Sequence, residues 1–326
     1  MPKTFDFTDI ERLVSSARLN SYRTAFRTVG KADLFGIYSW NLELSGALNS
    51  LLQLVEVALR NAINEAGKTH VETAAGQNWF DAVPFTLIED ETAVLAEGEQ
   101  PPLIKAQQTK DFFSGISSAK KKAQRLLRKK LGEDTTAVPT LDQIISQTDF
   151  SVWEYILDKS FYDGDAAKKF LWPKGYITAF KKPPQVEGKN KQFQQRDMIR
   201  RRIETVRMLR NRVAHNEPVW KDVNTDDTSV IIHKLKDKIN EVLELTYWIS
   251  PVLYTYIKNG SIIHRLNILL CDHEINNSLY KNSDIDIVDL SSLNLAVTDI
   301  HSDDKRLLIQ VNGKRSIIFS RKNRFN

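Results

Sequence analysis

The stretch from Ala32 to Gly67 constrains the fold most, because it contains no proline and carries an apolar stripe at helical spacing. The stripe consists of Leu44, Leu48, Leu51, Leu52, Val55, Leu59 and Ile63. This pattern predicts one long helix that buries one face. The pattern stays dominantly helical to about residue 258, so we expect a mainly α protein.

Further segments are expected to be helices, one of them Leu103–Leu131, which Gly132 ends. Asp9–Val29 has apolar residues at a rough spacing of three to four, and Phe193–Glu217 is a basic helix that Pro218 ends. Thr228–Lys258 has an apolar face, and Pro251 should kink it.

The composition changes after Gly260. Asn312-Gly313 is a hairpin signal between two segments of strand composition. Four segments are expected to be strands: Ile285–Leu290, Leu293–Ile300, Leu307–Val311 and Ser316–Phe319. We therefore expect a helical domain over residues 1–258, with 68–192 as a basic helical insertion, and a small C-terminal α/β or β appendage of unknown role over 259–326.

Composition narrows the class of protein. The chain has 326 residues, and its one cysteine, Cys271, excludes an internal disulfide and cysteine-rich zinc sites. No apolar run reaches the roughly 18 residues that span a bilayer, and the N-terminus does not resemble a signal peptide. We expect a cytoplasmic protein without membrane contact.

The charge is unevenly distributed. Residues 103–132 carry a net charge of +8 and residues 168–215 carry +11, so the rest carries −14 against a total of +5. Such basic blocks suit a polyanion, although a solvated helix face has the same composition. The candidate RNA-binding residues are Lys120, Lys121, Lys122, Arg125, Arg128, Lys129, Lys130, Arg200, Arg201 and Arg207.

The candidate catalytic residues are Arg210, Asn211 and His215, near the end of the basic helix. Histidine titrates near neutral pH, and arginine grips phosphate oxygens with two donors. RNA cleavage by the 2′-hydroxyl needs both functions and no metal or cofactor. Asn211 shares a helix face with His215, whereas Arg210 lies about 140° away around the helix. Alternatively, His215 only stabilises the helix C-terminus.

Two stretches carry a resemblance to a known family. One runs from Tyr38-Ser39-Trp40-Asn41 through Leu44-Ser45 to Val55-Glu56-Val57-Ala58-Leu59-Arg60-Asn61-Ala62, and the other is Leu209-Arg210-Asn211-Arg212-Val213-Ala214-His215-Asn216-Glu217-Pro218. The second resembles the Arg-x4-6-His motif of the HEPN superfamily. Over roughly residues 10–257 the chain resembles the Abi-like abortive-infection proteins of bacteria (the AbiD/AbiF group).

The resemblance implies a HEPN-like helical bundle, a homodimer, and metal-independent ribonuclease activity in phage defence or as a toxin. It assigns catalysis to Arg210, Asn211 and His215, and a supporting place in the cleft to Glu56, Arg60 and Asn61. A homodimer would place two copies of the catalytic arginine and histidine in one cleft, where a single chain supplies only one of each.

Two other functions stay open. The chain could hold a small noncoding RNA without cutting it, or its acidic regions and appendage could bind another protein. Cys271, His273 and Glu274, with His264 upstream, match no common metal-site spacing. There is no glycine-rich phosphate loop and no nucleophile elbow, so neither ATP hydrolysis nor serine-hydrolase chemistry is supported.

Overall fold

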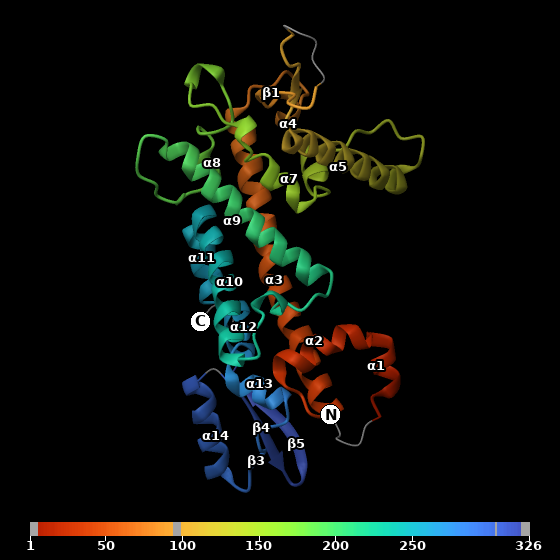
Figure 1. Ribbon diagram of the computed structural model, residues 1–326, viewed down its shortest axis with the longest axis vertical. Coiled ribbons are helices and arrows are strands. Elements are labelled where there is room, and N and C mark those ends of the chain that lie inside the picture. The colour runs from red at the N-terminus through yellow and green to blue at the C-terminus, as the bar shows by residue number, and fades with distance from the viewer. Residues whose placement is uncertain (1–5, 94–98, 304, 321–326) are drawn as a thin grey trace. The chain divides into compact units, whose positions relative to one another are not determined.

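The computed structural model describes residues 6–93, 99–303 and 305–320. The protein is mainly α, as the sequence predicts, and the described residues form fourteen α-helices, three short 3-10 helices and two small sheets (Figure 1). The chain divides into two compact units. Unit 1 comprises residues 1–53, 209–243 and 254–326, and unit 2 comprises residues 54–208 and 244–253.

The division between the units falls within four helices of the chain. They are α3 (Lys31–His70), α9 (Lys191–Ala214), α10 (Thr228–Ile249) and α11 (Pro251–Lys258). The long helix expected over 32–67 is confirmed and extends slightly at both ends. The break between α10 and α11 at Pro251 is also confirmed, since proline lacks the N–H that would continue the helical ladder.

Apart from η3, the remaining elements of unit 1 lie in the N-terminal and C-terminal parts of the chain. They are α1 (Thr8–Val14), α2 (Ser16–Phe26), η3 (Lys221–Val223), α12 (Ser261–Leu269), α13 (Asp272–Ser278), β3 (Ile285–Asp286), α14 (Leu290–Asp303), β4 (Arg306–Val311) and β5 (Lys314–Phe319). The single helix expected over Asp9–Val29 is wrong. Ser15 takes a positive φ of 78° and caps α2 by accepting a hydrogen bond from the Arg18 N–H, so the segment is two helices.

The remaining elements of unit 2 are short apart from one helix. They are α4 (Trp79–Ala82), β1 (Leu87–Glu89), β2 (Leu103–Lys105), α5 (Gln107–Leu131), α6 (Leu141–Ile145), α7 (Phe150–Tyr155), η1 (Lys159–Phe161), η2 (Ala166–Lys168) and α8 (Tyr176–Ala179). Strands β1 and β2 pair antiparallel. The aromatic rings of Trp172, Tyr176 and Phe180 are at most 3% exposed, so they belong to the core and do not offer stacking surfaces to bases.

The apolar stripe of α3 is buried in protein. Leu44, Leu51 and Leu59 are fully buried. By length and composition alone, α3 is the one helix among the described residues that could cross a membrane, and 39% of its most apolar window is buried. Core helices of soluble proteins pass the same test, so this finding is weak evidence of a span.

The C-terminal sheet has the order β3-β4-β5, with β3 parallel to β4 and β4 antiparallel to β5. The expected hairpin is confirmed, because both Asn312 and Gly313 take positive φ values, as a type I′ turn requires. The strand expected over Leu293–Ile300 is wrong, because this segment lies in α14 (Figure 1).

Capping chemistry explains α14. The Asp289 side chain accepts a hydrogen bond from the Ser292 N–H at 2.7 Å, and the Ser292 hydroxyl accepts one from the Asp289 N–H at 3.1 Å. This reciprocal pair starts a helix. Ala296 and Ile300, four residues apart, then pack on Leu307 and Ile309 of β4.

Two helices, α12 and α13, follow Gly260 before the first strand, within the segment expected to be a small α/β or β appendage. The Trp40 indole N–H donates to the Leu269 carbonyl at 2.8 Å, which ties α12 to α3 within unit 1. The two units cut across the boundary expected at residue 258. The division into a helical domain over residues 1–258 and an appendage over 259–326 stays a prediction.

Candidate functional site

The basic helix α9 ends with a specific backbone motif at the proposed catalytic residues. The Asn216 N–H donates to the Val213 carbonyl at 3.1 Å, and the Glu217 N–H donates to the Arg212 carbonyl at 2.9 Å. Asn216 takes φ 55°, so the pair of bonds forms a Schellman cap with asparagine at the left-handed position. The helix therefore stops at Ala214, and His215 is the first residue beyond it.

The segment after the cap is anchored within unit 1. Trp220 is buried, and its ring meets Tyr22 and Phe26 edge-on at centroid distances of 5.0 and 5.1 Å. The Arg18 guanidinium donates to the Asn216 carbonyl. These contacts fix the chain directly after His215, which is itself exposed.

A carboxylate in the same segment neutralises two cations. Asp222 accepts from Lys238 at 2.6 Å and lies 3.5 Å from Arg212 of the last α9 turn. Burial by itself raises the pKa of Asp222, but Lys238 and Arg212 outweigh it, so the net pKa lies below the ordinary aspartate value. Lys238 also donates to the Val219 carbonyl, which completes the connection from α10 to this loop.

The three proposed catalytic residues differ in exposure. His215 is exposed, whereas Arg210 and Asn211 are half-buried. The His215 N–H donates to the Asn211 carbonyl at 2.9 Å, and the Arg210 guanidinium lies 3.5 Å from the Asn211 amide oxygen. The imidazole is thus open to a ligand, and the helix end holds arginine and asparagine in the turn beside it.

The proposed supporting residues lie in the other unit. Glu56 and Arg60 of α3 are half-buried, and Asn61 is exposed. All three belong to unit 2, whereas Arg210 and His215 belong to unit 1. Their supporting role in a catalytic cleft stays a prediction.

The cations in the middle of α9 are engaged by carboxylates within unit 2. Glu154 of α7, only 4% exposed, lies 2.6 Å from Arg207 and 3.4 Å from Arg200. Arg200 also meets Glu204 at 3.2 Å, and Arg201 meets Asp197 at 2.8 Å. A phosphate would have to compete with these carboxylates, although RNA binding by Arg200, Arg201 and Arg207 stays a prediction.

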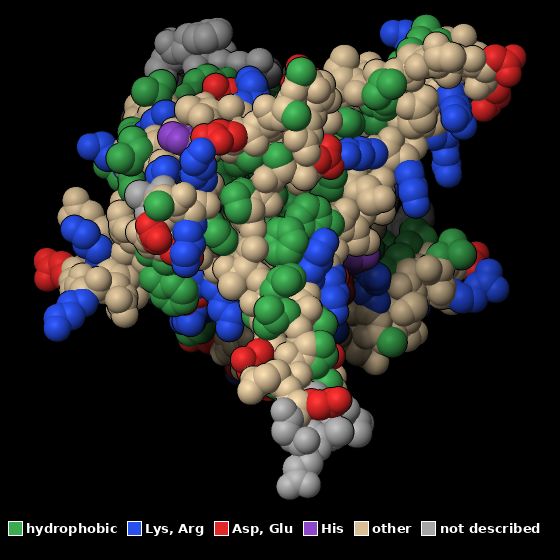
Figure 2. Space-filling view, turned by 90° about the horizontal axis from the view of Figure 1, so that it is seen from above, with side chains coloured by type: hydrophobic (Ala, Val, Ile, Leu, Met, Phe, Trp, Pro, Cys, Tyr) green, Lys and Arg blue, Asp and Glu red, His purple; other side chains and the backbone are tan. Residues whose placement is uncertain are grey.

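The cations of α5 are placed differently. Lys120 pairs with Asp81 at 2.6 Å, and Lys122 pairs with Asp149 at 3.4 Å. Five others are exposed and make no ion pair with any residue that the structure describes: Lys121, Arg125, Arg128, Lys129 and Lys130. Figure 2 shows Lys and Arg side chains standing out on the right, the direction in which α5 extends in Figure 1.

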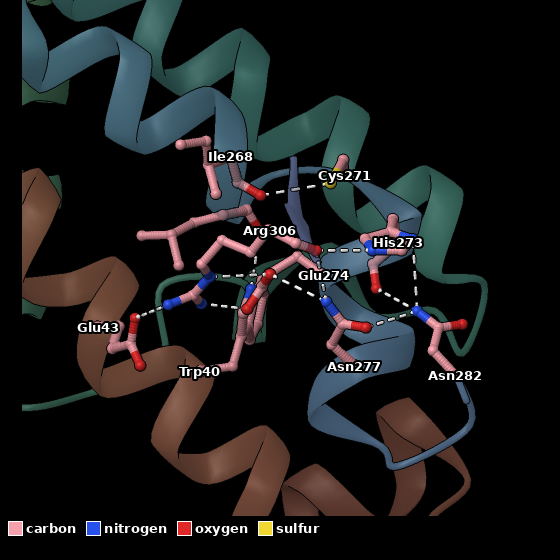
Figure 3. Close-up of polar contacts among 10 residues, drawn as sticks. Trp40, Glu43, Ile268, Cys271, His273, Glu274, Asn277, Asn282 and Arg306 are labelled. Atoms are coloured by element: carbon pink, nitrogen blue, oxygen red, sulfur yellow. Dashed lines mark hydrogen bonds and ion pairs between the residues drawn. The ribbon is translucent and has the colours of Figure 1, made fainter. Parts of the chain in front are cut away.

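A separate polar network joins three elements of unit 1 (Figure 3). Arg306 of β4 binds the buried Glu274 of α13 through two guanidinium nitrogens and reaches Glu43 of α3 at 2.9 Å. Burial raises the pKa of Glu274, although the hydrogen bonds and charge of Arg306 oppose the rise. His273 and Asn277 both contact the Arg306 carbonyl. The network holds the C-terminal sheet on the helices.

A pocket of about 620 Å³ lies beside this network. Apolar side chains of α12 alternate there with Ser261, His264 and Arg265, and Glu43 and Phe319 also line it. Its size suits a small ligand. No sequence pattern predicts this pocket, because Glu43 and Arg306 are 263 residues apart.

No group of three or more His, Cys, Asp or Glu side chains within the described ranges is placed to hold a metal ion. The candidate metal residues of the sequence are used otherwise, since Glu274 pairs with Arg306 and the Cys271 thiol contacts the Ile268 carbonyl.

Comparisons of the chain with family models, with curated proteins and with solved structures find no match.

Proposed function

We propose that the protein is a metal-independent endoribonuclease of the HEPN type, acting in phage defence by abortive infection or as a toxin. The observation that carries this proposal is the exposed imidazole of His215, held just beyond a capped basic helix with Arg210 and Asn211 in its last turn. The resemblance of the two sequence stretches to Abi-like proteins adds support.

The proposed residues divide the work by their chemistry. His215 moves a proton, and Arg210 binds the phosphate as negative charge builds on it. Asn211 positions the imidazole or a phosphate oxygen. The 2′-hydroxyl attacks the adjacent phosphorus, the bond to the 5′-oxygen breaks, and the products are a 2′,3′-cyclic phosphate and a 5′-hydroxyl.

Two copies of the chain would complete the site. Attack by the 2′-hydroxyl requires one proton to leave and another to reach the 5′-oxygen, and a lone His215 offers one imidazole. We propose a homodimer in which two helix ends face one cleft. Sedimentation of the purified protein at micromolar concentration tests this, and a monomer that cleaves RNA would contradict it.

The decisive experiment compares His215→Ala with a matched histidine variant. His233 on α10 is exposed and lies in the same unit, so His233→Ala removes an imidazole outside the motif. With single-stranded RNA in EDTA, we expect His215→Ala to lose about 10²–10⁴-fold in rate and His233→Ala to keep the wild-type rate. Equal rates for all three proteins would remove the mechanism.

A second function is favoured by a different observation. The exposed cations of α5 suit a protein that holds a small noncoding RNA without cutting it. The chemistry of the RNA ends separates the two functions. New 2′,3′-cyclic phosphate ends that are absent with the Arg210→Ala/His215→Ala variant support cleavage, and intact RNA in a stable complex supports holding.

A further inference from the structure

The C-terminal half of α5 carries four exposed cations on one side of the helix. At about 100° per residue, Lys121, Arg125, Arg128 and Lys129 fall within a sector of about 100°. All four are exposed, and we call them the α5 stripe. Lys130 lies on the opposite side of the helix by the same geometry.

The α5 stripe keeps its charge uncompensated among the described residues. The paired cations of the helix, Lys120 and Lys122, meet carboxylates of α4 and of the residue that precedes α7. The acid of α5 itself, Asp111, lies ten residues before the stripe, and Glu133 and Asp134 follow in the next loop. Like charges placed close together on one face repel each other, so an anionic ligand that spans them is favoured.

The stripe is also short and convex. With a rise of about 1.5 Å per residue, its ends are about 12 Å apart along the helix. Exposed Leu126 and Leu131, 52% and 55% exposed, lie on the same helix end. A flexible strand can bend around such a surface and place several phosphates on it, whereas a stiff duplex touches it with fewer.

We infer that the α5 stripe binds the phosphate backbone of single-stranded RNA without reading its sequence, as an anchor separate from the proposed catalytic residues. The inference deepens the proposed function, since it names the form of RNA that the protein takes. The two sites belong to different units, so each can be removed alone.

The test measures RNA affinity against salt concentration with the full-length protein. The stripe variant is Lys121→Gln/Arg125→Gln/Arg128→Gln/Lys129→Gln. A matched control, Lys189→Gln/Lys191→Gln/Lys234→Gln/Lys236→Gln, removes the same charge from other exposed positions. His215→Ala is included in every background, so that cleavage does not consume the probe, a labelled single-stranded RNA of mixed sequence.

Each phosphate contact contributes about 0.7 to the slope of log affinity against log salt for a single strand. We expect the stripe variant to lose about 3 in slope and roughly 10³-fold in affinity near 0.1 M salt, while the control stays close to the parent. Circular dichroism checks that the helices of both variants are intact.

Three outcomes would overturn the inference: an unchanged slope in the stripe variant, an equal loss in the control, or tighter binding of duplex RNA than of single-stranded RNA by the parent. The same variants distinguish a failure of the proposed cleavage from a failure of the proposed anchor. If His215→Ala cleaves like wild type while the stripe variant loses affinity, the catalytic proposal fails and the anchor stands.

Discussion

Helix α5 and the part of α9 that belongs to unit 2 use the same residue types in opposite ways. Along α9, Arg200 and Arg207 converge on Glu154, which is 4% exposed, so these cations stabilise the fold. Along α5, Arg125 and Arg128 are exposed and meet no carboxylate among the described residues. Charge density in a sequence therefore says little about whether a cation is available to a ligand.

The difference lies in where the opposing carboxylates come from. Glu154 reaches α9 from a helix that precedes it by about fifty positions, and Arg196 is buried with its guanidinium on the Leu157 carbonyl. Burial lowers the pKa of Arg196, so the fold places this cation where charge is costly. No comparable partner among the described residues reaches the exposed end of α5.

The largest effect that the comparison predicts is on stability. Glu154→Gln should lower the free energy of unfolding by about 3 kcal/mol, because it leaves Arg200 and Arg207 facing a buried neutral group. The control Glu204→Gln removes a carboxylate that also meets Arg200 but is 40% exposed, and it should cost less than about 1 kcal/mol. Urea denaturation measures both. Equal losses would mean that burial does not distinguish these carboxylates.

Much of the helical fold could be predicted from the sequence. The proline-free apolar stripe of α3 and the proline between α10 and α11 are local signals, and both are confirmed. The segment Leu293–Ile300 was misread because its β-branched residues suggested a strand. The signal that decides its structure, the Asp289 and Ser292 capping pair, lies before it.

In the candidate site, too, features with a local sequence signal could be predicted and contacts between distant residues could not. Pro218 predicts that α9 ends near the motif, but the helix ends at Ala214 and not at Glu217, because Asn216 takes the left-handed conformation of the cap. The engagement of Arg200 and Arg207 could not be predicted, because it depends on a carboxylate distant in the sequence. The Glu43–Arg306 contact is more distant still. Local spacing carries no information about such pairings.

The second prediction compares one exposed arginine from each helix. Arg125→Gln removes a cation of the α5 stripe, and Arg201→Gln removes one that already binds Asp197 and is 72% exposed. We expect Arg125→Gln to weaken single-stranded RNA binding about fivefold near 0.1 M salt, since one phosphate contact is lost. Arg201→Gln should change the affinity less than twofold. Fluorescence anisotropy measures both affinities. A larger loss for Arg201→Gln than for Arg125→Gln would indicate that α9, not α5, binds the RNA.

The smallest effect concerns the last turn of α9, where Arg212 and Lys238 meet Asp222. Because these cations hold the pKa of Asp222 below its ordinary value of 3.8, its ionised form stabilises the fold above that pH, and the contribution disappears as the pH falls through the lowered pKa.

Asp222→Asn should therefore cost a fraction of 1 kcal/mol at pH 7, because the carboxylate is 48% exposed and its pairs are screened by water. The difference between wild type and variant should shrink as the pH falls below 3.8. Urea denaturation at pH 7, 5 and 3 measures it, with Lys238→Gln/Asp222→Asn as the double variant that should add little to the single loss. A gap that persists at pH 3 would show that packing, not charge, stabilises this helix end. No carboxylate in the described part of the chain pairs with the α5 stripe, so Arg125→Gln should show no comparable pH dependence in stability.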